Sequence, residues 1–161
     1  MTVWVVDTSP LIFMSRLGRL NLLQSGADQV VIPQAVFDEI QVRPDEAARQ
    51  IEQATLSWLT VKQVDDLDAV DLLRADLDRG EAEVIVLAKK LGADWVIIDD
   101  LDARRFARRV GLNLVGTVGL LLAARLRGEI TSLRGEIERL EQLGFRVAPS
   151  LANAMLEAAQ E

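Results

Sequence analysis

Apolar runs and helical stripes alternate along the chain, and this alternation is the main guide to its fold. Short, almost wholly apolar runs predict buried strands, while apolar residues that recur every three or four positions predict helices. Strands are predicted at residues 3–6, 30–32, 59–64, 95–98 and 112–115. Helices are predicted at 10–15, near 19, and at 34–42, 44–58, 68–77, 81–91, 102–110, 118–127, 131–143 and 149–160. This order favours an α/β three-layer sandwich with a central, mostly parallel twisted sheet and additional C-terminal helices.

Local signals refine this pattern. Ser9 followed by Pro10 is typical of a helix N-cap and a first helical residue, and Pro44 is expected to open another helix. The strand at 59–64 is expected at an edge of the sheet. No internal repeat, low-complexity tract or linker interrupts the chain, so residues 1–161 are expected to form a single domain.

The composition is that of an ordinary folded domain. Of the 161 residues, 50% are hydrophobic and 27% are charged, a balance that allows a full hydrophobic core. No apolar run approaches the ~20 residues of a membrane span, and the N-terminus lacks the pattern of a secretory signal. Cysteine is absent, which is compatible with a reducing compartment. We therefore expect a cytoplasmic protein with no membrane contact.

The absent residue types exclude several kinds of chemistry. Without histidine, cysteine or tyrosine, the chain cannot build a Ser-His-Asp site, a Cys-His site or a typical zinc site. Hard cations that prefer oxygen ligands, such as Mg²⁺ or Mn²⁺, are the metals that suit the remaining side chains. The formal charge of −7 argues against a protein that coats nucleic acid, but it allows local contacts through a metal and a few arginines.

Acidic residues follow two of the predicted buried strands. Asp7 comes after the first strand, and Asp99 and Asp100 come after the fourth. In parallel α/β sheets this carboxyl edge is where ligands bind, so these acids are candidates for a site. The alternative for Asp7 is an Asx turn or a helix cap. Glu39 borders an apolar helical stripe, and its neighbour Asp38 points away from that stripe. Glu39 alone is weak evidence for a site and becomes a candidate only together with the other acids.

Glu81 gives the sharpest signal. It lies three and seven residues before Val84 and Ala88, so it is expected to project along the inward face, whereas Glu83 points to the side. A carboxylate that faces the core must be paired, protonated or bound to a metal. The alternative is a capping box, with Asp78 as the N-cap and Glu81 as the third helical residue.

The helix after the fourth strand carries a basic face. Its members are Arg104, Arg105, Arg108 and Arg109. This face is suited to phosphate contacts near the acids, with Arg104 and Arg108 as candidate substrate-binding residues. The alternative is an ordinary solvated helix face. Aromatic residues make up only 4% of the chain, and no base-stacking platform is visible.

Four segments together resemble the PIN domain family, in particular the small prokaryotic PIN-like proteins related to VapC-type toxins. They are VVDTSPLI, VVIPQAVFDEI, GEAEVIVLAKKLGADWVIIDD and GLNLVGTVGLLLAARLRGEI. Their order and spacing make the resemblance fairly specific, and it covers most of the chain, including the ending LGFRVAPSLANAMLEAAQE. It implies a PIN-like fold, with the three layers that the alternating pattern also favours.

The resemblance implies a site of four catalytic acids. They correspond to Asp7, Glu39, Glu81 and either Asp99 or Asp100. Many relatives carry Asp where this chain has Glu81, which is longer by one methylene. Thr8 and Ser9 match the small hydroxyl position after the first acid, where an oxygen can orient a water or a phosphate. The expected metal ligands are Asp7, Glu81, Asp99 and Asp100.

The implied activity is that of a Mg²⁺- or Mn²⁺-dependent endoribonuclease that cuts single-stranded RNA. Either one ion or two ions about 4 Å apart can serve this chemistry. The alternative is a catalytically degenerate PIN-like protein with a binding or regulatory role. A phosphatase of the haloacid dehalogenase type would need Asp in place of Ser9, and a receiver domain would need a Lys where Gly116 and Thr117 stand.

The resemblance also implies partners. Such toxins act as homodimers and are held inactive by a small antitoxin protein, a segment of which enters the acidic groove. The succession Leu11, Ile12, Phe13 and Met14 carries more apolar surface than one core contact requires. It indicates either a protein interface or a helix that is buried on two sides.

Overall fold

The computed structural model describes residues 1–161, which form five strands and ten helices. The strands are β1 (Val3–Val6), β2 (Gln29–Pro33), β3 (Leu59–Lys62), β4 (Trp95–Ile97) and β5 (Leu114–Val115). They form one sheet in the order β3-β2-β1-β4-β5, and every neighbouring pair is parallel. The predicted α/β class with a central parallel sheet is therefore confirmed, and β3 lies at an edge as expected.

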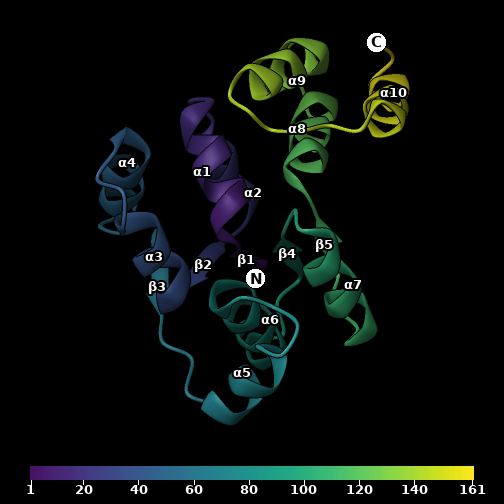
Figure 1. The fold of residues 1–161 in the computed structure, drawn as a ribbon. Helices are drawn as coiled ribbons and strands as arrows, with labels where there is room; N and C mark the ends of the chain where they lie inside the picture. The colour runs from purple at the N-terminus through teal and green to yellow at the C-terminus, as the bar shows by residue number, and fades with distance from the viewer.

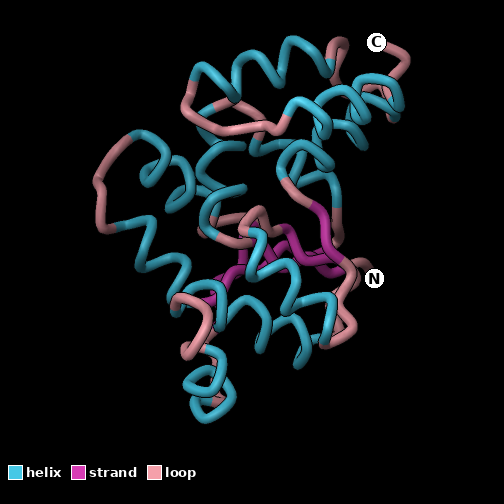
Figure 2. The backbone as a smooth tube through the Cα atoms, turned by 45° about the vertical axis from the view of Figure 1, so that its right-hand side comes forward, coloured by secondary structure: helices cyan, strands magenta, loops and turns pink.

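Helices cover both faces of the sheet. They are α1 (Thr8–Arg16), α2 (Leu20–Gly26), α3 (Gln34–Gln41), α4 (Glu46–Ala54), α5 (Leu67–Leu73), α6 (Arg79–Leu91), α7 (Leu101–Arg109), α8 (Thr117–Leu126), α9 (Leu133–Gln142) and α10 (Pro149–Ala158). Figure 1 shows α5 and α6 below the sheet and α1 and α8 above it. In Figure 2 the magenta strands run between these two helical layers. The C-terminal α9 and α10 pack on α8.

The central strands are buried on both sides, which explains their uninterrupted apolar sequence. Val5 pairs with Val31 on one side and with Val96 on the other, and none of the three is exposed to solvent. These strands contribute to one cluster of 40 buried apolar residues. No helix combines the length and the apolar character needed to cross a bilayer.

Several boundaries differ from the sequence-based predictions by a few residues, and three of these differences have a local cause. Helix α1 begins at Thr8, so Asp7 rather than Ser9 occupies the N-cap position. Helix α4 begins after Asp45, whose side chain accepts a hydrogen bond from the Ala48 amide, and not at Pro44. Strand β3 ends at Lys62 because its partner there is Pro33, which has no N–H to continue the ladder.

The parallel arrangement brings distant acids to one edge. Strands β1 and β4 are neighbours in register, with Val6 opposite Ile97, and the Asp7 amide donates to the Ile97 carbonyl at 2.9 Å. Asp7 directly follows β1 and Asp99 lies two residues after the end of β4, so both acids stand at the same edge of the sheet.

Candidate active site

A cleft of about 600 Å³ opens at the carboxyl edge of the sheet. It is lined by Asp7, Thr8, Ser9, Ile12, Phe13, Arg16, Glu39, Arg43, Asp78, Glu81, Asp99, Asp100, Phe145 and Arg146. All five acids singled out in the sequence, and both hydroxyl residues, are among them. They come from the β1–α1 and β4–α7 junctions, from α3 and from the start of α6.

Asp7 is the most deeply buried of these acids, with 6% of its surface exposed. It occupies the N-cap position of α1, yet its side chain makes no capping hydrogen bond, so the helix-cap alternative does not explain it. The pKa of Asp7 is raised to about 7, mainly by burial; the Thr8 amide opposes the rise, and the charges of Glu81, Asp78 and Glu39 add to it. The site therefore disfavours a negative charge at Asp7 unless positive charge is supplied.

Glu81 forms the capping box that was the alternative for it, and it lines the cleft instead of facing the core. The capping box is present: Asp78 Oδ1 accepts from the Glu81 amide at 2.8 Å, and Glu81 Oε1 accepts from the Asp78 amide at 3.1 Å. The same side chain lines the cleft and is only partly buried, at the helix start and not in the core. Burial raises the pKa of Glu81 to about 7, and the charges of Asp78 and Asp100 add to the rise.

Asp99 and Asp100 are adjacent in sequence but are held differently. Asp99 accepts hydrogen bonds from the Thr117 amide at 2.8 Å and the Thr117 hydroxyl at 2.6 Å, at the start of α8. Burial raises the pKa of Asp99, while the Thr117 bonds, the charge of Arg104 and the Ser9 hydroxyl oppose the rise. Asp100 is exposed and caps α7 through the Ala103 amide at 3.0 Å. Both line the cleft, so both Asp99 and Asp100 are candidates for the fourth acid that the resemblance implies.

Glu39 is held at the cleft by the start of α1. The Thr8 hydroxyl donates to Glu39 Oε2 at 2.7 Å. Gly80 makes room for this carboxylate, since a Cβ at position 80 would lie 3.0 Å from Glu39 Oε2. Thr8, predicted to contact substrate, is thus engaged with a neighbouring acid.

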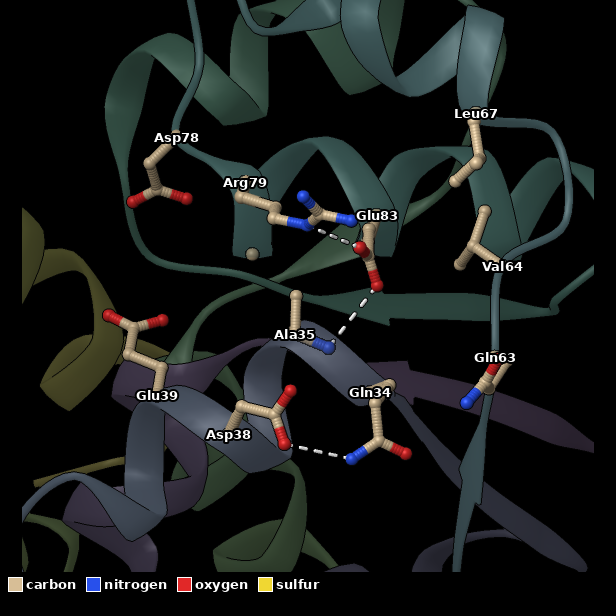
Figure 3. A pocket seen from close by; sticks show the side chains of 11 residues that line it. Gln34, Ala35, Asp38, Glu39, Gln63, Val64, Leu67, Asp78, Arg79 and Glu83 are labelled. Atoms are coloured by element: carbon tan, nitrogen blue, oxygen red, sulfur yellow. Dashed lines mark hydrogen bonds and ion pairs between the residues drawn. The ribbon is translucent and has the colours of Figure 1, made fainter.

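A second pocket adjoins the cleft and shares Glu39 and Asp78 with it (Figure 3). Glu83 lies in this pocket, 4% exposed, and not beside the apolar stripe as expected from the sequence. It pairs with Arg79 at 3.0 Å and accepts from the Ala35 amide at 3.2 Å. Glu83 therefore fastens α6 to the start of α3, which satisfies its buried charge.

The predicted basic face of α7 does not line the cleft. Arg104 is partly buried, and its Nη1 donates to the Ile98 carbonyl at 2.8 Å, while Arg108 is exposed. Arg104 also lies close to Asp99, whose pKa it lowers. The hydrogen bond of Arg104 stabilises the segment just after β4. A role of Arg104 and Arg108 in substrate binding stays a prediction.

Comparison with known protein families fits this architecture. A family model described as a PIN domain matches residues 3–161. The chain belongs to the PIN domain family. No curated protein matches this PIN domain. PIN domains are generally nucleases, and PIN nucleases typically use divalent metals.

The donor set of this PIN domain suits a hard cation. Carboxylate oxygens are the ligands that Mg²⁺ and Mn²⁺ prefer. The raised pKa values of Asp7 and Glu81 mean that nearby positive charge would favour their ionised forms. No three acidic side chains are close enough together to form a ready-made metal site, so binding would require small side-chain movements.

Several residues of the cleft were not identified from the sequence. Asp78 was considered only as a cap, and no role was predicted for the three arginines of the lining, Arg16, Arg43 and Arg146. The aromatic pair Phe13 and Phe145 joins α1 to the α9–α10 loop, with ring centroids 5.0 Å apart. No base-stacking platform was visible in the sequence, because these two rings come together only after folding.

Proposed function

We propose that this PIN domain is a Mg²⁺- or Mn²⁺-dependent endoribonuclease that hydrolyses phosphodiester bonds in single-stranded RNA. The observation that carries the proposal is the convergence of Asp7, Glu39, Glu81, Asp99 and Asp100 in one open cleft. The raised pKa of the buried Asp7 supports it, since a carboxyl group in this state would gain from a bound cation.

Each acid has a distinct task in this proposal. Asp7, Glu81 and one or both of Asp99 and Asp100 hold the metal, which supplies positive charge to neutralise the phosphodiester and lowers the pKa of the attacking water. Glu39 completes the acidic cluster and is oriented by Thr8. The Ser9 hydroxyl is placed to orient a water or a phosphate oxygen.

The proposal is tested with Glu81→Gln. Glutamine keeps a side-chain oxygen that can accept from the Asp78 amide, so the capping box survives while the charge is removed. We expect cleavage of a mixed RNA pool in Mn²⁺ to fall by orders of magnitude, while the melting temperature in EDTA stays the same or rises through relieved repulsion. EDTA is the control for metal dependence, and Glu138→Gln, at an exposed position on α9, is the matched control for lost charge.

Two results would contradict parts of the proposal. Full activity of Glu81→Gln would remove Glu81 from the site. If the wild type cleaves no RNA with either metal, the second candidate applies: a degenerate PIN-like protein with a binding or regulatory role. The Glu at position 81, where many relatives of the family carry Asp, is the observation that keeps this candidate in view.

We extend the proposal to a toxin of a toxin–antitoxin pair, acting as a homodimer and inhibited by a small antitoxin. The extension rests on the resemblance to VapC-type toxins. The apolar run on α1 no longer supports it: Leu11 and Met14 are in the core, and Ile12 and Phe13 line the cleft. Sedimentation at tens of micromolar (roughly the scale of a weak contact) should give a dimer, and a monomer would overturn this extension.

A further inference from the structure

Besides its acids, the cleft is lined by aromatic and basic side chains. They are Phe13, Arg16, Arg43, Phe145 and Arg146. We call this surface the Phe–Arg wall. It combines apolar ring surface with three guanidinium groups, next to the five acids of the proposed nuclease site.

The end of α9 determines where Phe145 lies. The Gly144 amide donates to the Glu141 carbonyl and the Phe145 amide to the Leu140 carbonyl, each at 3.0 Å, which is a Schellman motif. Gly144 has a φ of +94°, a value that L side chains rarely adopt. The chain thus turns back towards α1, and Phe145 meets Phe13 edge to face, with an interplanar angle of 83°.

The arginines of the wall have few partners within the protein. Arg16 lies 3.6 Å from Asp45 and 5.9 Å from the centroid of Phe13. Arg43 and Arg146 are exposed and form no ion pair. In a chain with a formal charge of −7, unpaired arginines beside a cleft are available to an anionic ligand.

We propose that the Phe–Arg wall binds the nucleotide next to the cleaved phosphodiester, with the base against Phe13 and Phe145 and the flanking phosphates at Arg43 and Arg146. The proposal rests on the proposed function in taking RNA as the ligand. An apolar ring beside guanidinium groups matches the two parts of a nucleotide, its flat base and its anionic phosphate. A base must be unstacked to reach the rings, so the wall selects single strands over duplexes.

Binding, measured without metal, tests this inference apart from cleavage. The probe is a fluorescent single-stranded RNA of about eight nucleotides in EDTA, compared with abasic versions and with the same sequence as a duplex. The variants are Phe145→Leu, which retains apolar packing without the ring, and Arg146→Gln, which removes a charge that has no partner in the protein. The matched controls are Phe106→Leu on α7 and Arg74→Gln after α5, both outside the cleft.

We expect Phe145→Leu to weaken single-strand binding by about tenfold and to abolish the difference between intact and abasic RNA. Arg146→Gln should weaken binding of every sequence and reduce the slope of affinity against salt by about 1. The controls should bind as the wild type does. Thermal melts accompany each variant, and Arg146→Gln tests the wall even if Phe145→Leu unfolds.

Other results would overturn the inference. Unchanged binding by Arg146→Gln and by a folded Phe145→Leu would mean that the wall does not contact RNA. The inference would also be wrong if the wild type bound the duplex as tightly as the single strand, or if it bound neither. If the wild type cleaves RNA but the wall variants bind RNA normally, the inference about the wall is wrong and the proposed nuclease function stands. If the variants show the expected binding pattern but the wild type does not cleave RNA, the wall is supported and the proposed nuclease function is wrong.

Discussion

Replacing Asp7 with Asn should stabilise the metal-free protein, and the gain should grow with pH. Asp7 is almost fully buried, and its pKa rises from an ordinary 3.8 to about 7. Between these values the folded protein retains a proton that the unfolded chain releases. The free energy of unfolding therefore falls as pH rises through this window, and the loss is complete above the folded pKa. Asparagine keeps the size and the oxygen acceptor but cannot ionise.

The magnitude follows from the two pKa values. One pKa unit corresponds to about 1.4 kcal/mol, so full ionisation of Asp7 lowers the stability by about 4 kcal/mol. At pH 5 only about a third of this loss has developed, because only the unfolded chain has begun to ionise. The stability difference between Asp7→Asn and the wild type should thus increase by about 2–3 kcal/mol from pH 5 to pH 8.

Urea denaturation in EDTA at pH 5 and pH 8 measures this difference. Comparing the two pH values cancels any effect of the amide that does not depend on pH. The exposed Asp71→Asn on α5 is the matched control for loss of one acid from the surface. A stability difference for Asp7→Asn that is the same at both pH values would refute the reasoning and would place a solvated, ordinary carboxylate at the end of β1.

Two further predictions concern the same cleft. Millimolar Mn²⁺ or Mg²⁺ should raise the melting temperature of the wild type by roughly 5 °C, and Asp7→Asn should lose most of this rise. Samples without the metal are matched in ionic strength with NaCl. Equal shifts in the wild type and in Asp7→Asn would mean that the ions bind elsewhere. Gly116→Ala should displace Asp99 and lower RNA cleavage, because the new Cβ would lie 2.8 Å from Asp99 Oδ1. The control Gly135→Ala, whose Cβ would have no contact closer than 3.4 Å, should leave RNA cleavage intact. Normal cleavage by Gly116→Ala would show that Asp99 need not hold its position.

The fold could be predicted largely because its strands are short apolar runs. The strands around β1 are buried on both faces, so their sequences contain almost no polar residue, and the sequence between them has helical periodicity. Boundaries were less predictable where two signals compete. Ser9 and Pro10 have the chemistry of a helix start, but α1 begins earlier because Asp7 already leaves the sheet in an extended conformation, with ψ at 170°.

The acids of the site could be predicted for a different reason. Asp7 directly follows one buried strand and Asp99 lies two residues after another, and parallel pairing brings such residues to one edge without any knowledge of side-chain packing. The aromatic lining of the cleft had no comparable signal. Phe13 and Phe145 are far apart in sequence and meet only through the packing of α9 and α10 on α8. The glycine at position 144 allows the turn that ends α9, but the sequence does not give the direction of that turn.

The most direct test of the central claim compares RNA cleavage by the wild type and by Asp7→Asn in Mn²⁺ at pH 8. The account predicts that the wild type cleaves single-stranded RNA, and that Asp7→Asn does not, although it is the more stable protein without metal. Loss of activity in a stabilised variant cannot be attributed to unfolding. Cleavage by Asp7→Asn at the wild-type rate would contradict the account, because the buried acid at the centre of the cleft would then have no part in the chemistry.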